Sequence, residues 1–159
     1  MEKKKTPSKK STEREKGKPT KNKSKEPLRS FHIVGIGASA GGLEAIEGFF
    51  TQMSSNANMA FFIIQHLAPK YKIMGSLLGN YTKMKILEMK DGMKVEPTCV
   101  YLNPPNMDVA ILNRTIHLIE LPEPHAIRLS IDYFFRSLAE DQGEKAIGIV
   151  LSGTGADGS

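Results

Sequence analysis

Cysteine is almost absent from this sequence of 159 residues, and tryptophan is missing altogether. The single cysteine, Cys99, excludes an intrachain disulfide and a metal site built from several thiolates. The residues around it predict a strand in which Cys99 fills a small space in the core. The histidines also lack the close spacing of metal ligands, so we expect no metal site. These histidines are His32, His66, His117 and His125. No cofactor is expected either.

Long apolar runs are absent as well. No stretch approaches the roughly 20 apolar residues that a membrane-spanning helix requires. The N-terminal segment also lacks the apolar centre of a secretion signal. We therefore expect a cytoplasmic chain that is not inserted into a membrane.

Acidic residues are scarce at the start of the chain. Residues 1–28 contain eleven Lys and Arg against four acidic residues, whereas residues 29–159 contain eleven against thirteen. The first segment has almost no apolar side chains, so it cannot bury enough surface to offset its chain entropy. We predict a disordered basic tail over 1–28 and one catalytic domain over 29–159. A solvated leader is favoured over a charge-driven contact with lipid or nucleic acid, so no nucleic-acid partner is expected.

Apolar runs separated by glycines and prolines divide residues 29–159 into alternating strands and helices. FHIVGIG and MAFFIIQ are typical of buried parallel strands, and apolar residues recur every three or four positions from Gly42 to Met53 between them. A strand-helix-strand series of this kind makes its two strands parallel. The later predicted elements are a helix over 71–81, strands over 85–89 and 98–103, a hairpin over 109–119, a helix over 131–141 and a strand over 146–151.

This order predicts a doubly wound, mostly parallel sheet of the Rossmann-like α/β class with a small antiparallel hairpin. Ser130 is the expected N-cap of the helix over 131–141. The chain stops at Ser159, where a helix should follow to cover the sheet. We therefore expect the domain to be incomplete at its C-terminus.

Polar, glycine-rich or proline-flanked segments follow three of the predicted parallel strands: GASAGG, QHLAP and SGTGADG. Because the carboxyl ends of parallel strands form one ligand-binding edge, we expect the three segments to share that edge. The first segment allows two interpretations. Gly35-x-Gly37-x-x-Ala40 matches the dinucleotide-binding fingerprint, and GASAG around Ser39 matches a nucleophile elbow.

The end of the second strand favours the elbow. A dinucleotide site expects an acidic residue there, but the chain has Gln65 and His66. A serine hydroxyl needs a neutral imidazole to accept its proton, so Ser39 and His66 form a candidate pair. Asp157 can orient that imidazole, although an aspartate that caps the next helix or shapes the turn remains the alternative.

Backbone N–H groups complete the predicted site. Those of Thr154 and Gly155 in the third segment, and of Ala40 at a helix N-terminus, are suitable donors to an oxyanion.

The ordered motifs VGIGASAGGLEAI, FFIIQHLAP, VYLNPPN and IDYFFRSLAEDQGEKAIGIVLSGTGADGS resemble the CheB-type chemotaxis protein-glutamate methylesterases from about Phe31 to Ser159. The similarity is greatest to the version that opens methylesterase/methyltransferase fusion proteins. It implies that Ser39 is the nucleophile, His66 the general base and acid, and Asp157 its orienting partner. The backbone at Thr154 corresponds to the oxyanion donor of the family.

The resemblance also implies a reaction and partners. The expected reaction removes methyl groups from glutamate methyl esters on methyl-accepting chemotaxis receptors, with release of methanol, and deamidates glutamines. A methyltransferase domain is the expected partner, in cis or in trans, and phosphorylation of a receiver domain within this chain is not expected. Two alternatives remain: a nucleotide-binding module that uses the GIGASAGG loop, and a noncatalytic interaction fragment.

Overall fold

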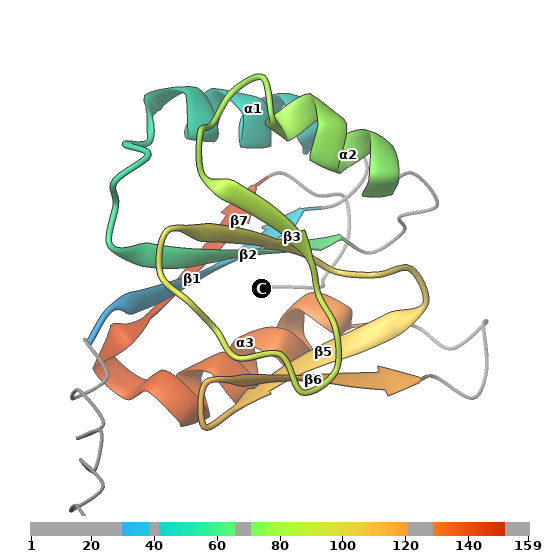
Figure 1. The fold of residues 1–159 in the computed structure, drawn as a ribbon. Helices are drawn as coiled ribbons and strands as arrows, with labels where there is room; N and C mark the ends of the chain where they lie inside the picture. The colour runs from blue at the N-terminus through green and yellow to red at the C-terminus, as the bar shows by residue number, and fades with distance from the viewer. Residues whose placement is uncertain (1–29, 39–41, 66–70, 121–128, 152–159) are drawn as a thin grey trace, which may run out of the picture.

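A sheet with helices on both faces forms the body of the molecule (Figure 1). The computed structural model describes residues 30–38, 42–65, 71–120 and 129–151. The predicted basic tail and the expected continuation beyond Ser159 lie outside these residues.

Five strands pair in the order β3-β4-β2-β1-β7, and every neighbouring pair is parallel. A separate antiparallel hairpin consists of β5 and β6. These elements confirm the predicted doubly wound, mostly parallel sheet with a small hairpin. The strands are β1 (His32–Ala38), β2 (Met59–Gln65), β3 (Lys85–Glu88), β4 (Cys99–Leu102), β5 (Met107–Leu112), β6 (Thr115–Glu120) and β7 (Ala146–Leu151), and the helices are α1 (Leu43–Gln52), α2 (Tyr71–Leu78) and α3 (Ser130–Gln142), which a short 3-10 turn (Gly143–Lys145) follows.

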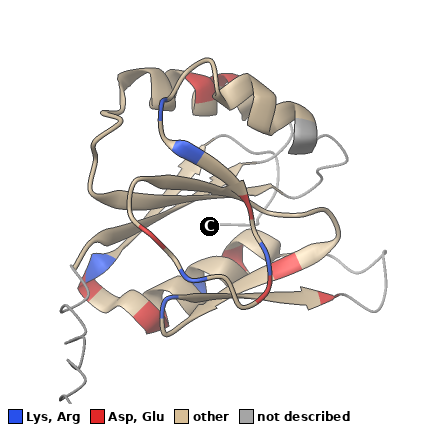
Figure 2. Ribbon diagram, viewed as in Figure 1, with Lys and Arg blue, Asp and Glu red and all other residues tan. Residues whose placement is uncertain are grey.

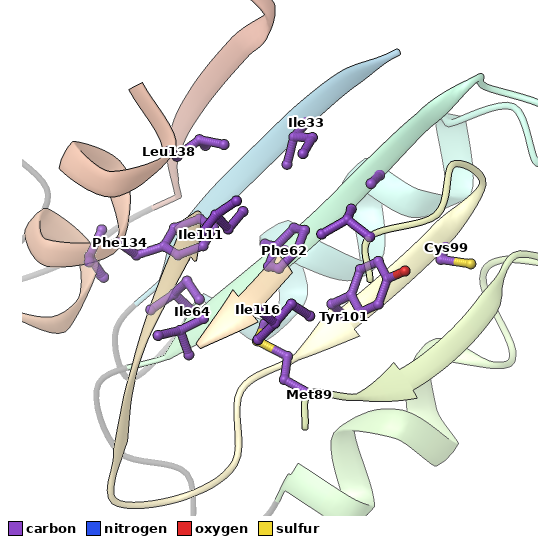
Figure 3. Packing of buried hydrophobic residues seen from close by; sticks show 14 of the residues in the cluster. Ile33, Phe62, Ile64, Met89, Cys99, Tyr101, Ile111, Ile116, Phe134 and Leu138 are labelled. Carbon is purple, nitrogen blue, oxygen red and sulfur yellow. The ribbon is translucent and has the colours of Figure 1, made fainter. Parts of the chain in front are cut away.

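Alternating side chains of the central strands enter two cores, one on each face of the sheet. Because successive strand residues point to opposite faces, Val34 and Ile36 pack towards α1 and α2, whereas Ile33 packs towards α3 and the hairpin. On the α3 side, the Phe62 ring stacks between Tyr101 and Phe134, with centroid separations of 4.8 and 5.2 Å (Figure 3). Burial of each such ring stabilises the fold by about 1.5–3 kcal/mol.

Two glycines let α3 approach the middle of the sheet. Gly35 and Gly37 both lie within β1, on the face that α3 covers. A Cβ atom on Gly35 would lie 2.8 Å from the Phe134 ring, and one on Gly37 would lie 2.4 Å from Ile131 Cγ2. No side chain fits at either position unless the α3 side chains or the helix itself shift, so these glycines allow the observed close packing of α3 on β1.

The hairpin is fastened to α3 at its turn. Asn113 and Arg114 have φ angles of 52° and 53°, as the two central residues of a type I′ turn require. The Asp141 carboxylate accepts hydrogen bonds from both backbone N–H groups, and its Oδ2 lies 3.0 Å from the backbone nitrogen of Arg114. The Arg114 guanidinium also lies 4.7 Å from the centre of the Phe31 ring.

Two local predictions were wrong. The helix predicted over 71–81 ends at Leu78, because Gly79 and Asn80 are poor helix formers, and the N–H groups of Asn80 and Tyr81 bond three residues back instead of four. Ser130 is not the N-cap of α3 but its first residue, and its hydroxyl donates to Asp108 Oδ1 at 2.6 Å. The link to β5 therefore uses the oxygen that was expected to cap the helix.

Over the part of the chain that the structure describes, no helix combines the length and the apolar character needed to cross a membrane.

We expect Gly37→Ala to lower the free energy of unfolding by about 1–3 kcal/mol, because the added methyl would overlap the buried Ile131 side chain. Gly48→Ala is the matched control, since Gly48 lies on the exposed side of α1, where an added methyl group would have no atom within 4 Å. The control should gain about 0.5–1 kcal/mol from its higher helix propensity. Urea denaturation of the two variants measures both changes, and equal effects would contradict the close approach of α3.

The phenol of Tyr101 should make stability depend on alkaline pH. Burial raises the pKa of Tyr101 from 10.0 to about 12 in the folded protein. Between these values the unfolded chain loses a proton that the folded chain keeps, so the free energy of unfolding falls as pH rises from 10 to about 12. The Tyr101→Phe variant has no phenol hydroxyl and therefore does not undergo this titration. The stability difference between wild type and Tyr101→Phe should therefore shrink over this range in urea denaturation, and a constant difference would contradict the buried phenol.

Candidate active site

The last residues of three strands lie side by side at the carboxyl edge of the sheet. Ala38 at the end of β1 pairs with Gln65 at the end of β2 on one side. On its other side it pairs with Leu151 at the end of β7. Neighbouring strands are about 4.8 Å apart, so the three chain segments that follow start within about 10 Å of one another.

Each predicted site residue follows one of these strand ends. Ser39 and Ala40 come directly after β1, and His66 comes directly after β2. The residues predicted in the third segment, Thr154, Gly155 and Asp157, come after β7. All six lie outside the described residues, so the structure places the points from which they start and not their side chains.

The segment that bears Ser39 joins a strand to a helix. Residues 39–42 connect the end of β1 to the start of α1 at Leu43. Gly42 is the N-cap of α1, its carbonyl accepts the first helical hydrogen bond from Ile46, and no side-chain cap is seen among the described residues. A short strand-turn-helix connection is the context that a nucleophile elbow requires.

Packing accounts for the two glycines that the dinucleotide fingerprint shares with this sequence. In that fingerprint the glycines turn the chain and let a pyrophosphate approach. Here Gly35 and Gly37 lie inside β1 and make room for α3. β2 ends at Gln65 where an acidic residue would hold a ribose, and β1, β2 and β7 carry no charged residue (Figure 2). The nucleotide-binding interpretation is therefore not supported.

A buried asparagine at the same edge was not predicted. Asn103 follows β4, is 7% exposed, and contacts the backbone at the end of β2. Its Oδ1 accepts a hydrogen bond from the Gln65 N–H at 3.1 Å, and its Nδ2 donates to the Gln65 carbonyl at 3.3 Å. The signal in the sequence was a polar residue between a buried strand and two prolines, in the motif VYLNPPN.

The described residues offer no metal centre and no activated thiol. They contain no group of three or more His, Cys, Asp or Glu that could hold a metal ion. Cys99 is buried at the amino end of β4, away from the strand ends described above, and burial raises the pKa of its thiol. This confirms its predicted place in the core. His32 and His117 lie in strands, as expected, with His32 exposed to solvent.

Comparisons with known proteins point to one family. The family model of the CheB methylesterase matches residues 34–159. The protein-glutamate methylesterase/protein-glutamine glutaminase of Desulfotalea psychrophila is 28% identical over 134 residues, which cover 80% of this chain and 37% of that protein. The protein-glutamate methylesterase/protein-glutamine glutaminase 3 of Leptospira interrogans is 31% identical over 132 residues, which cover 80% of this chain and 38% of that protein.

A solved structure has the same fold. The crystal structure of the Thermotoga maritima CheB methylesterase catalytic domain superposes with a TM-score of 0.71 at 26% sequence identity, covering 81% of this chain and 71% of that one. The chain thus spans well under half the length of the curated relatives, at 37% and 38%, but most of the catalytic domain. With its family-model match, its curated relatives and its fold in agreement, the chain belongs to the CheB methylesterase family.

Proposed function

We propose that the chain provides the catalytic machinery of a protein-glutamate methylesterase, with Ser39 as nucleophile, His66 as general base and acid, and Asp157 as the partner that orients His66. The observation that carries this proposal is the register that aligns Ala38, Gln65 and Leu151. Membership of the CheB methylesterase family supports the assignment of the chemistry. The predicted domain boundaries, a basic tail over 1–28 and a catalytic domain over 29–159, are part of the same proposal.

The order of the strands is compatible with a triad. His66 directly follows β2, which pairs with β1, so the chain segments that bear Ser39 and His66 start about one strand spacing, about 4.8 Å, apart. Asp157 follows β7, on the other side of β1, and must pass over the end of β1 to reach the imidazole. An extended chain from Leu151 to Asp157 reaches about 20 Å, which exceeds the about 10 Å between β7 and β2.

In the first half of the reaction, Ser39 Oγ attacks the γ-carbonyl carbon of a glutamate methyl ester while His66 accepts the hydroxyl proton. The backbone N–H groups of Ala40, Thr154 and Gly155 donate to the resulting oxyanion. When this intermediate collapses, the bond to the methoxy oxygen breaks and His66 returns its proton to that oxygen. Methanol leaves, and the glutamyl group stays on Ser39 as an ester.

In the second half, His66 accepts a proton from water as the water oxygen attacks the glutamyl ester. The serine oxygen then leaves with that proton, which restores Ser39 and releases the glutamate carboxylate. For a glutamine substrate, ammonia replaces methanol as the first product. The names of the relatives include both activities.

The substrate side chains belong to another protein in this proposal. We infer that they are glutamates on methyl-accepting chemotaxis receptors, that the enzyme acts in the cytoplasm, and that a methyltransferase domain supplies the methyl esters in cis or in trans. An esterase that acts on side chains of a protein surface needs an open cleft instead of a deep pocket.

We expect Ser39→Ala to lower methanol release from methylated receptor by at least about 10³-fold, because the nucleophile of a triad cannot be replaced by a methyl group. The same variant should resist labelling by a fluorophosphonate that reacts with activated serines. Ser76→Ala is the control, since Ser76 is an exposed serine on α2, and it should react like the wild type. Unchanged labelling of Ser39→Ala would refute the assignment, and a wild-type chain that is neither labelled nor active would favour the noncatalytic interpretation.

A further inference from the structure

Asn103 continues the hydrogen-bond ladder between β4 and β2 beyond the last residue of β4. Its backbone N–H donates to the Ile63 carbonyl at 3.4 Å, as a regular parallel ladder requires. Its side chain then occupies the next step of the ladder. The carboxamide oxygen faces the Gln65 N–H and the carboxamide nitrogen faces the Gln65 carbonyl, so each atom meets a partner of the opposite kind.

The two prolines that follow explain why a side chain is needed at this step. In a parallel ladder that continued with the same spacing, the N–H of residue 105 would donate to the carbonyl of Gln65. Residue 105 is a proline, as is residue 104, and proline has no N–H to donate. The carboxamide nitrogen of Asn103 supplies the missing donor to the Gln65 carbonyl, and its oxygen accepts the hydrogen bond from the Gln65 N–H. The Asn103 side chain thereby links the last residue of β2 to the chain that follows β4.

This contact reaches the residue that follows β2. The carbonyl of Gln65 belongs to the peptide group that also contains the nitrogen of His66, and the planar peptide extends to the Cα of His66. A hydrogen bond to that carbonyl therefore restricts the orientation of the peptide plane between Gln65 and His66. Because Asn103 is 7% exposed, water competes little for this bond.

We propose that Asn103 is a positioning residue for the catalytic imidazole: it fixes the Gln65–His66 peptide so that His66 meets Ser39 in reactive geometry. The inference rests on the proposed function of Ser39 and His66. Without this contact the protein would still contain the nucleophile and the base, but the two groups should no longer be aligned for reaction. A misplacement of about 1 Å can lower a rate about 10²-fold, which sets the scale of the expected effect.

The test measures the rate of fluorophosphonate labelling of Ser39 in the full chain, over a range of reagent concentrations and after correction for the folded fraction. In Asn103→Ala the maximal labelling rate should fall about tenfold or more, while the reagent concentration that gives half of this rate changes by less than about threefold. Asn103→Asp conserves the shape of the side chain, but when ionised it cannot donate to the Gln65 carbonyl. It should therefore show a similar loss, even if Asn103→Ala folds poorly.

Thr98→Ala is the matched control, because it removes a comparable link at the opposite end of the same strand. Thr98 precedes β4, and its hydroxyl donates to the Ala57 carbonyl at 3.3 Å, just before β2 begins. We expect it to lower stability but to leave the maximal labelling rate of the folded protein within about twofold of the wild type. If Asn103 had a purely structural role, the maximal labelling rate would be similar in Asn103→Ala, Asn103→Asp and Thr98→Ala.

The outcomes separate the inference from the function on which it rests. A wild type that is labelled at Ser39, together with Asn103 variants that react as fast as Thr98→Ala, would overturn the inference alone. A wild type that is not labelled would overturn the proposed function, and the inference with it. Slower labelling of both Asn103 variants at an unchanged half-maximal concentration would support both.

Discussion

Parallel pairing of β1 with β2 on one side and with β7 on the other is the constraint on which the candidate site depends. It makes β1 an inner strand and brings its last residue, Ala38, next to Gln65 and Leu151. These positions are far apart in the sequence, and only the sheet brings them together. A slip of one residue along either pairing would turn the side chains of a whole strand to the other face, so the two cores fix the register.

The two faces of β1 have different tasks. Towards α1 and α2 it presents aliphatic side chains that fill a core, and towards α3 it presents Gly35 and Gly37, which leave room for the helix. The close approach of α3 also affects the hairpin, because Asp141 near the end of α3 holds the hairpin turn. At the carboxyl edge, the end of β2 is held by β1 and by the carboxamide of Asn103. The strand ends from which the candidate site residues start are thus held by several contacts among the described residues.

Much of the fold could be predicted from the sequence because its strands are short apolar runs bounded by turn residues. β2 was predicted with its observed bounds, since MAFFIIQ has polar residues or proline on both sides. Contacts between distant segments could not be predicted in this way. The oxygen of Ser130 was expected to cap its own helix, but it bonds to Asp108, and the side chain of Asn103 reaches an adjacent strand. The identities and the common edge of the candidate catalytic residues follow from motifs and topology, whereas the distances between their side chains depend on loops that no periodic pattern specifies.

A crystal structure that includes residues 39, 66 and 157 would test the central claim most directly. The account predicts that Ser39 Oγ lies within hydrogen-bond reach of one imidazole nitrogen of His66, about 2.6–3.2 Å away, and that the Asp157 carboxylate lies equally close to the other. Side chains on opposite faces of the sheet, or separated beyond contact at its carboxyl edge, would contradict it.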